Sequence, residues 1–196
     1  MPVQERANIQ SFLDYLKFEK RYSAHTLLAY TNDLTDFFDF LEVQYGIQSV
    51  RDIQSTIVRS WLASLKDKGL GAVTLNRKIS SLKSFFKYQL KTGGVEQSPM
   101  GQVISPKKSK RLPVFAREDE MNDLVHTLEG AAEDWRSLNR KMLVAIFYAT
   151  GMRLSELTGL KEGQVDESRG LIKVLGKGNK ERVIPVSPEL MAAIRE

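Results

Sequence analysis

The chain has 196 residues, of which 42% are hydrophobic and 27% are charged, and its formal net charge is +5. These proportions are typical of a soluble globular protein, and no apolar run is long enough to span a bilayer. The absence of cysteine excludes disulfides, a thiol nucleophile and cysteine-based zinc sites, and the two histidines, His25 and His126, are too far apart to suggest a metal site. The N-terminus lacks the apolar stretch of a signal peptide, so we expect a cytoplasmic protein with no metal and no cofactor.

Apolar residues recur at helical spacing in four segments of the first half, at about residues 4–19, 24–44, 55–68 and 72–91. Ser23 has the position of an N-cap before the second segment, and glycines follow the last three. We therefore expect residues 1–92 to form a compact bundle of four helices. Its aromatic stripes, with Phe37 and Phe38 among them, are expected in the core rather than stacked on bases.

Basic residues are concentrated between residues 71 and 113, where nine lysines and arginines stand against one acid, Glu96. This segment has a net charge of +8, so the rest of the chain carries −3. Such a basic belt on a near-neutral protein suggests a polyanion as partner. The alternative for any single lysine is a solvated face.

The fourth predicted helix carries hydroxyl and basic residues opposite much of its apolar stripe. Arg77, Ser80, Ser81 and Ser84 recur at helical spacing, and Lys83 and Lys87 form a flanking row. Small hydroxyls beside basic side chains allow a helix to approach a duplex closely and to bond phosphates and base edges. An ordinary exposed helix face remains the alternative.

Residues 93–113 show no persistent period and are punctuated by Gly, Pro and Ser, so they are expected to form a linker. Its basic run could follow a phosphate backbone and let two domains close around a duplex; a charged solvated linker is the alternative. The run consists of Lys107, Lys108, Lys110 and Arg111.

The second half predicts helices at about residues 116–129 and 135–148, a turn at Thr150–Gly151 and a short helix through Leu160 capped by Ser155. Residues 171–175 and 182–186 are expected to be strands joined by a GKGNKE turn. A last helix begins at Ser187–Pro188. Tyr148 is expected in the core of its helix.

Two residues of this half are suited to handling a phosphate. Arg153 follows the Thr150–Gly151 turn and is expected to be a buried arginine, and Lys177 lies in the hairpin turn. Arginine offers a planar fork of donors, and lysine is a compact charge that can also lose a proton. Taken separately, Arg153 with Glu156 is usually a surface helical ion pair, and GKGNK is usually a solvated loop.

Together, ATGMRLSEL and LIKVLGKGNKERVIPV closely resemble the catalytic domain of tyrosine site-specific recombinases, the phage integrase family, and most of all its bacterial Xer members. The segments KRYSAHTLLAYTNDLTDFFDFL (20–41) and TLNRKISSLKSFFKYQL (74–90) resemble the family's core-binding domain. The resemblance implies a mainly α chain with a four-helix, SAM-like core-binding bundle and part of an α+β catalytic domain with a small β-hairpin. The expected domains are a DNA clamp at 1–92, a basic linker at 93–113 and a partial catalytic domain at 114–196.

In the family, a tyrosine attacks DNA and forms a 3′-phosphotyrosyl bond. By resemblance, Arg153 would donate to the scissile phosphate and Lys177 would be the general acid. Glu156 would hold Arg153, and Thr150 and Gly151 would shape the turn that presents it. No cofactor is implied.

The resemblance also implies DNA contacts in the first half. Carried over by position, they fall on two helices: Ser23, His25, Thr26 and Tyr30 on the second, and Thr74, Asn76, Arg77, Ser81 and Lys83 on the fourth. His25 could equally be a plain residue of a helix N-terminus. The implied partners are double-stranded DNA with two inverted half-sites and a tetramer of recombinase subunits.

The family pattern continues after Lys177 with His-x-x-Arg, a later His or Trp, and the nucleophilic Tyr. None of these follows Lys177 here, and the last tyrosine is Tyr148. We therefore expect a C-terminally truncated chain that binds DNA but does not cleave it. Its parent would resolve chromosome dimers, with integration of a mobile element as the runner-up.

A non-catalytic DNA-binding protein remains the alternative from another class. It predicts the same basic belt but leaves the joint occurrence of Arg153, Glu156 and Lys177 unexplained. A nucleotide-binding P-loop is disfavoured, because GKGNK lies between strands and is followed by no Ser or Thr.

Overall fold

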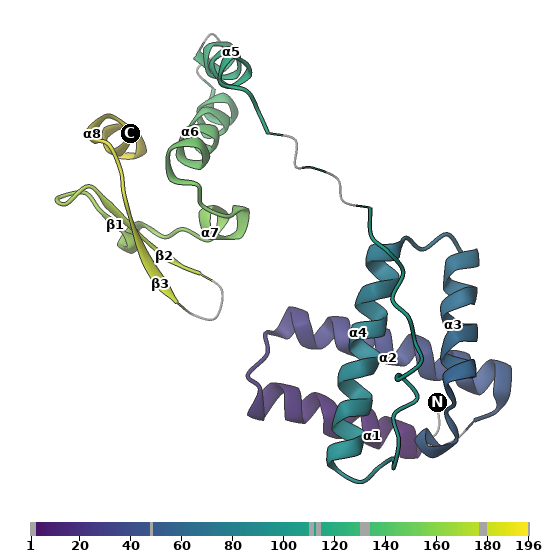
Figure 1. Cartoon of the computed structure of the whole chain (residues 1–196). Coiled ribbons are helices and arrows are strands. Elements are labelled where there is room, and N and C mark those ends of the chain that lie inside the picture. Colours follow the sequence, from purple (N-terminus) through teal and green to yellow (C-terminus); the bar gives the residue numbers. More distant parts are fainter. Residues whose placement is uncertain are drawn as a thin grey trace. The chain divides into compact units, whose positions relative to one another are not determined.

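The computed structural model describes residues 3–47, 49–109, 112, 115–129, 134–176 and 180–195. The chain divides into two compact units, Met1–Arg111 and Leu112–Glu196 (Figure 1). The described chain is mainly helical and contains one small antiparallel sheet, as the sequence predicted. None of the described helices has the length and apolar character that a membrane crossing would need.

The first unit is built from the helices that its apolar spacing predicted. In its described residues the elements are α1 (Val3–Asp14), a π-helical turn (Tyr15–Glu19), α2 (Ala24–Tyr45), a short 3-10 turn (Val50–Asp52), α3 (Ser55–Asp67) and α4 (Ala72–Lys91) (Figure 1). The expected cap is present, because Ser23 Oγ accepts a hydrogen bond from the N–H of Thr26 at 3.3 Å. Gly46 ends α2 with a φ of +62°, a conformation that glycine adopts at little cost.

Aromatic side chains form the centre of this unit's core. Phe12, Phe38 and Phe85 are buried and meet edge to face, with ring centroids 5.5 Å apart for Phe12–Phe85 and 5.6 Å for Phe38–Phe85. Phe37 packs in the same manner on Trp61 at 4.9 Å. The expectation that these rings are core rather than base-stacking platforms is confirmed.

The segment after α4 belongs to this core as well. Val95, Met100 and Val103 lie within the expected linker, yet each is at most 6% exposed and packs in the bundle's hydrophobic cluster. The first unit therefore extends well beyond residue 92. These residues lie outside any helix or strand, so no helical or strand period in the sequence indicated their burial.

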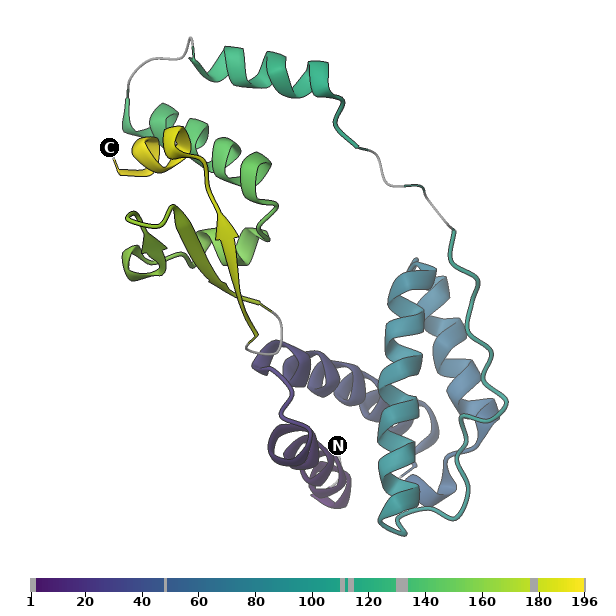
Figure 2. The same ribbon diagram turned by 60° about the vertical axis from the view of Figure 1, so that its left-hand side comes forward.

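The described elements of the second unit are α5 (Glu118–Glu129), α6 (Trp135–Thr150), α7 (Leu154–Thr158), a 3-10 turn (Glu162–Gln164), β1 (Val165–Asp166), β2 (Leu171–Leu175), β3 (Glu181–Pro185) and α8 (Pro188–Arg195). Of these, α6, α7 and α8 share one core with the small sheet, and α5 packs on α6 (Figures 1 and 2). The strands are antiparallel in the order β1-β2-β3, with Ile172 opposite Ile184. The hairpin was predicted, whereas the two residues of β1 are too few to show a strand pattern.

The core of this unit comprises Ile146, Met152, Leu157, Ile172, Val174 and Met191. The apolar residues of α6 were expected to face inward, yet Leu138 is 48% exposed and Leu143 42%. Tyr148, which we expected in the core, is 61% exposed. The apolar composition of the helix therefore gave a wrong prediction for Tyr148, because the buried side of α6 contains Ile146 whereas Tyr148 lies on its exposed side.

Candidate active site and nucleic-acid interface

The turn between α6 and α7 presents Arg153. Gly151 ends α6 with a φ of +59°, and its N–H donates to the carbonyl of Phe147 at 3.0 Å. The Thr150 hydroxyl donates to the carbonyl of Ile146 and accepts the N–H of Met152 at 3.3 Å. Met152 is then buried, which anchors the chain just before Arg153.

Glu156 is the centre of the charged cluster at this turn. Its Oε2 accepts the N–H of Arg153 at 2.7 Å and its Oε1 accepts Arg153 Nη1 at 3.0 Å. Arg182 on β3 binds the same carboxylate through two parallel hydrogen bonds, each of 2.8 Å. The Glu156 side chain is 4% exposed, so the carboxylate is enclosed by its two arginines.

The electrostatic consequence is a carboxylate that stays ionised. The hydrogen bond from Arg182, followed by that from the backbone of Arg153, lowers the pKa of Glu156 to about 2. The same contact with Glu156 raises the pKa of Arg182. Glu156 thus keeps its negative charge throughout the ordinary pH range and holds both guanidinium groups.

Two sequence-based expectations for this turn need correction. Arg153 is not buried, because 66% of its side chain is exposed; the buried member of the pair is Glu156. Ser155 does not cap α7 either. The cap position falls on Arg153, whose N–H is accepted by Glu156 three residues later.

Arg182 is a member of this cluster that our sequence analysis missed. It converts Arg153–Glu156 from a local helical pair into a link between α7 and the sheet. A signal was available in the alternation of β3, which places Arg182 on the same face as the half-buried Ile184. A charged residue on an inward strand face requires a partner.

The predicted general acid Lys177 lies outside the described residues, which end at Gly176 and resume at Lys180 on this hairpin. The described neck of the hairpin lies against the cluster. The N–H of Gly176 donates to the carbonyl of Lys180 at 2.7 Å. A Cβ added at Gly176 would lie 3.5 Å from Arg182 Nη1 and 3.7 Å from Glu156 Oε1, so the residue before Lys177 borders the cluster.

On α2, the predicted DNA-contacting residues lie at the start of the helix. Ser23 and His25 are exposed, whereas Thr26 and Tyr30 are half-buried. Ser23 Oγ lies 2.9 Å from Thr26 Oγ1, and Tyr30 donates its hydroxyl to Ser84 Oγ on α4 at 3.3 Å. The structure therefore brings the start of α2 beside the middle of α4.

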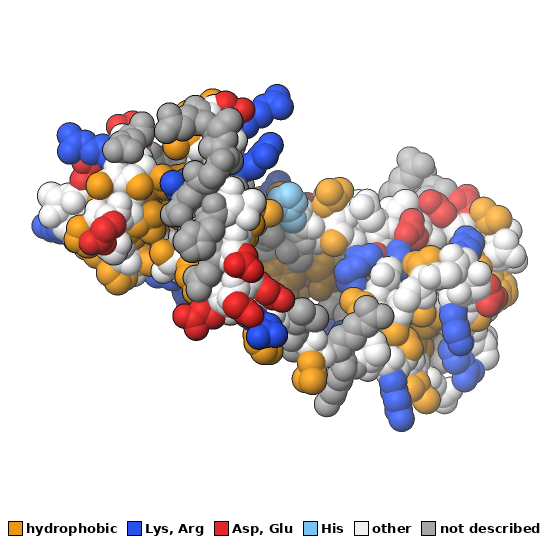
Figure 3. All heavy atoms as spheres, turned by 90° about the horizontal axis from the view of Figure 1, so that it is seen from above, with side chains coloured by type: hydrophobic (Ala, Val, Ile, Leu, Met, Phe, Trp, Pro, Cys, Tyr) orange, Lys and Arg blue, Asp and Glu red, His pale blue; other side chains and the backbone are white. Residues whose placement is uncertain are grey.

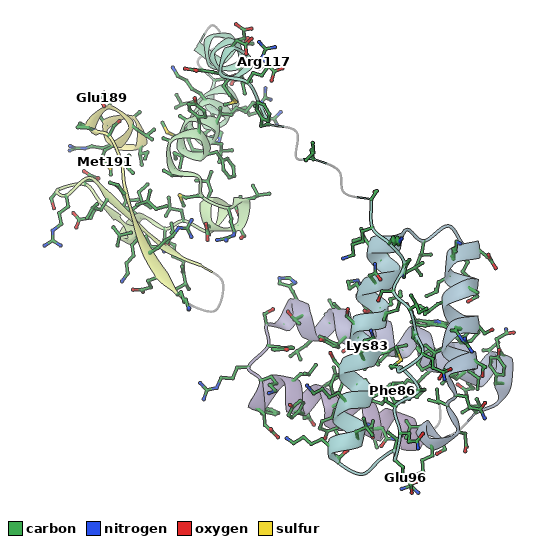
Figure 4. All side chains as sticks on the ribbon, viewed as in Figure 1. Lys83, Phe86, Glu96, Arg117, Glu189 and Met191 are labelled. Atoms are coloured by element: carbon green, nitrogen blue, oxygen red, sulfur yellow. The ribbon has the colours of Figure 1, made fainter. Side chains whose placement is uncertain are left out.

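On α4, the predicted contacts divide into outward and inward residues. Arg77, Lys83 and Lys87 are exposed, and Thr74 is half-buried; Figure 4 labels Lys83 on this helix together with the buried Phe86. Ser81, in contrast, is 5% exposed and faces α2, because it donates to the buried Asp33. The predicted DNA contact of Ser81 is therefore not on the surface of the bundle.

Asn76 also faces inward, since it is 9% exposed and its Nδ2 donates to the carbonyl of Pro106 at 2.8 Å. It ties the chain after the bundle to α4 just before the basic run. In that run Lys107 and Lys108 are exposed, while Lys110 and Arg111 lie outside the described residues. Figure 3 shows Lys and Arg side chains in blue on the surface of each unit.

Comparisons with known proteins cover both units. Residues 9–93 match the family described as "Phage integrase, N-terminal SAM-like domain", and residues 115–196 match the "Phage integrase family". The tyrosine recombinase XerC of Halalkalibacterium halodurans is 37% identical over 196 residues, which is all of this chain and 64% of that protein. The chain thus spans somewhat less than two thirds of this relative's length.

Solved structures share the fold at low sequence identity. The Tn1549 transposon integrase in complex with a circular intermediate DNA has a TM-score of 0.69 and 17% identity, over 96% of this chain and 63% of that one. A lambda integrase tetramer bound to a Holliday junction has a TM-score of 0.67 and 17% identity, over 92% of this chain and 50% of that one.

Proposed function

Because this chain belongs to the phage integrase family, we propose that it serves site-specific DNA recombination, in which strands are cut and rejoined through a 3′-phosphotyrosyl intermediate. The observation that carries the proposal is the cluster of Arg153, Glu156 and Arg182. An exposed guanidinium is held there by a buried carboxylate that is itself fixed from the sheet. A surface helical ion pair would need neither the burial nor the second arginine.

The chemistry of a phosphodiester explains why such a cluster is useful. Negative charge develops on the non-bridging oxygens in the transition state, and preorganised donors stabilise it. We assign this role to Arg153, with Glu156 fixing its position and Thr150 and Gly151 shaping its turn. Lys177 is assigned the protonation of the leaving 5′ oxygen.

The nucleophile is the role that these 196 residues do not fill by the family pattern. No tyrosine follows Tyr148, and no His-x-x-Arg follows Lys177. We therefore expect this polypeptide to bind duplex DNA without forming a covalent adduct. Since Tyr148 is exposed, its replacement by Phe is the proper check on any adduct that is observed.

We propose chromosome-dimer resolution as the biological role of the recombinase, acting on the chromosome in the cytoplasm. The relative that is 37% identical is named XerC, whereas the transposon and phage integrases are 17% identical. Integration of a mobile element is the second candidate. In either case the substrate would be duplex DNA with two inverted half-sites, bound by four recombinase subunits.

A non-catalytic DNA-binding role is the competing hypothesis. It would use the exposed basic residues of α4 and of the segment after it but would not need Arg153 near a phosphate. The two hypotheses differ in what they predict for a bound duplex. Recombination requires a defined half-site, and the competing role does not.

The test is selection of bound duplexes from a random library, followed by incubation of the winner with this chain. We expect enrichment of one half-site and no adduct resistant to denaturation. Binding without any sequence preference would favour the non-catalytic role. Failure to bind at low salt would refute the DNA-clamp function of residues 1–113. A covalent adduct would overturn the predicted lack of cleavage, and its loss in Tyr148→Phe would identify Tyr148 as the attacking residue.

A further inference from the structure

A buried polar network joins α2 to α4 in the first unit. The side chain of Asp33 is fully shielded from solvent. Its Oδ1 accepts Lys78 Nζ at 3.0 Å, and its Oδ2 accepts Ser81 Oγ at 2.7 Å as well as Arg77 Nη1. A carboxylate at this depth is strongly unfavourable unless it is both paired and hydrogen-bonded.

Lys78 and Ser81 already meet that requirement. Lys78 is 6% exposed in its side chain, so its charge is buried next to that of Asp33. Lys78 Nζ also lies 2.6 Å from Asp36 Oδ2, but Asp36 is 56% exposed and is stabilised by solvent. Asp33 is therefore held from within the bundle by Lys78 and Ser81, while Lys78 also serves Asp36.

Arg77 is the exposed cation of this network and makes its two cations equal in number to its two carboxylates, Asp33 and Asp36. Its side chain is 48% exposed, and only Nη1 contacts Asp33. Within the described residues, Nε and Nη2 of Arg77 have no recorded acceptor. A guanidinium is a rigid planar fork, so fixing one nitrogen restricts the orientation of the others.

We propose that Asp33 is a positioning residue, which holds Arg77 through Nη1 so that Nε and Nη2 are ready to donate to a hydrogen-bond acceptor of duplex DNA. The acceptor is a phosphate oxygen or the edge of a base, both of which an arginine fork can bind. This inference rests on the proposed DNA-binding function of the first unit. It also explains why Ser81 and Lys78, on the same helix, face inward.

The experiment measures affinity for the selected duplex in the whole chain. Removal of the guanidinium in Arg77→Met is expected to weaken binding roughly 5- to 150-fold, the range for loss of one well-made arginine contact. Arg77→Lys should lose nearly as much affinity for the duplex, because a single ammonium cannot donate to Asp33 and to DNA at once with the geometry of a guanidinium fork. Asp33→Asn should also weaken binding, but not further when Arg77→Met is already present.

Asp36→Asn is the matched control, because it removes a carboxylate that contacts Lys78 but not Arg77. Its affinity for the duplex should equal that of the wild type. A salt titration and a set of single-base substitutions then identify the acceptor. A phosphate contact lowers the salt slope by about 1 at every sequence, whereas a base contact relaxes preference at one position.

The positioning inference is overturned if Asp33→Asn melts like the wild type and binds as tightly, or if it weakens binding equally with and without Arg77→Met. If Asp33→Asn does not fold, Arg77→Lys decides, and wild-type affinity in that variant refutes the inference. Absence of binding by the wild type at low salt would instead refute the proposed function itself.

Discussion

The exposed basic residues of the first unit make a quantitative prediction for DNA binding. Five described candidates are exposed: Arg77, Lys83 and Lys87 on α4, and Lys107 and Lys108 after it. Each phosphate that is neutralised contributes about −0.9 to the slope of log affinity against log salt. Five contacts give a slope of about −4.5, which corresponds to roughly a 500-fold loss of affinity between 50 and 200 mM salt.

Replacing Lys83 and Lys87 with Gln should reduce the magnitude of this slope by about 2, while the fold is kept because both side chains are exposed. Arg59 and Lys66 offer a charge-matched control, since they are exposed and lie seven residues apart on α3. Their replacement with Gln removes the same charge but should leave the slope almost unchanged.

The assay is fluorescence anisotropy with the selected duplex at five or more salt concentrations, together with a thermal melt of each variant. An unchanged slope in the Lys83/Lys87 variant would refute the assignment of α4 to the phosphate backbone. Equal changes in the two double variants would show that net charge alone controls binding, and that no particular face of the bundle does so.

Three further predictions concern the second unit. The pKa of Glu156 is lowered to about 2 from an ordinary 4.5, so its contribution to stability is fully present above pH 4.5 and is lost as the pH falls toward 2. Thermal melts at a series of pH values should show a weaker acid dependence of stability in Glu156→Gln than in the wild type. An unchanged acid dependence would contradict this assignment. Gly151→Ala forces a side chain into the left-handed region and should destabilise the unit by about 1–2 kcal/mol in urea unfolding, whereas wild-type stability would show that the turn relaxes easily. Ile172→Ala should lower the free energy of unfolding by about 2–5 kcal/mol because Ile172 is fully buried. Val183→Ala is its control and should lower it far less, since Val183 is half-exposed. Equal losses in the two variants would show that Ile172 is not part of the core.

The elements of this protein were largely predictable because they depend on local sequence. Apolar residues at helical spacing placed α2, α3 and α4 within a residue or two of their observed bounds. The residues at the ends of elements were equally informative, as Ser23 and Gly46 show for α2. The resemblance to recombinases likewise rested on contiguous runs, around Arg153, at residues 171–186 and in the first half at 20–41 and 74–90, where the order of residues carries the signal.

The partners of the polar residues could not be predicted in the same way. A helical period indicates that Ser81 is near the boundary of the buried face of α4. It does not indicate that Ser81 bonds Asp33 on α2, 48 residues earlier in the sequence. Arg182 likewise reaches Glu156 over 26 residues of chain. Both contacts depend on how two elements are packed, which local spacing does not encode.

By itself, then, the sequence determined the helices, the hairpin, the turn before Arg153 and the family of the chain, because each of these depends on short, contiguous segments. The tertiary structure decided which charges are buried and which remain free. It enclosed Asp33 and Glu156, each of which then requires cationic donors, and it left the outer side of Arg77 and Arg153 exposed. A buried carboxylate can be compensated only by groups that the fold brings to it, and that requirement made these two arginines fixed and yet accessible.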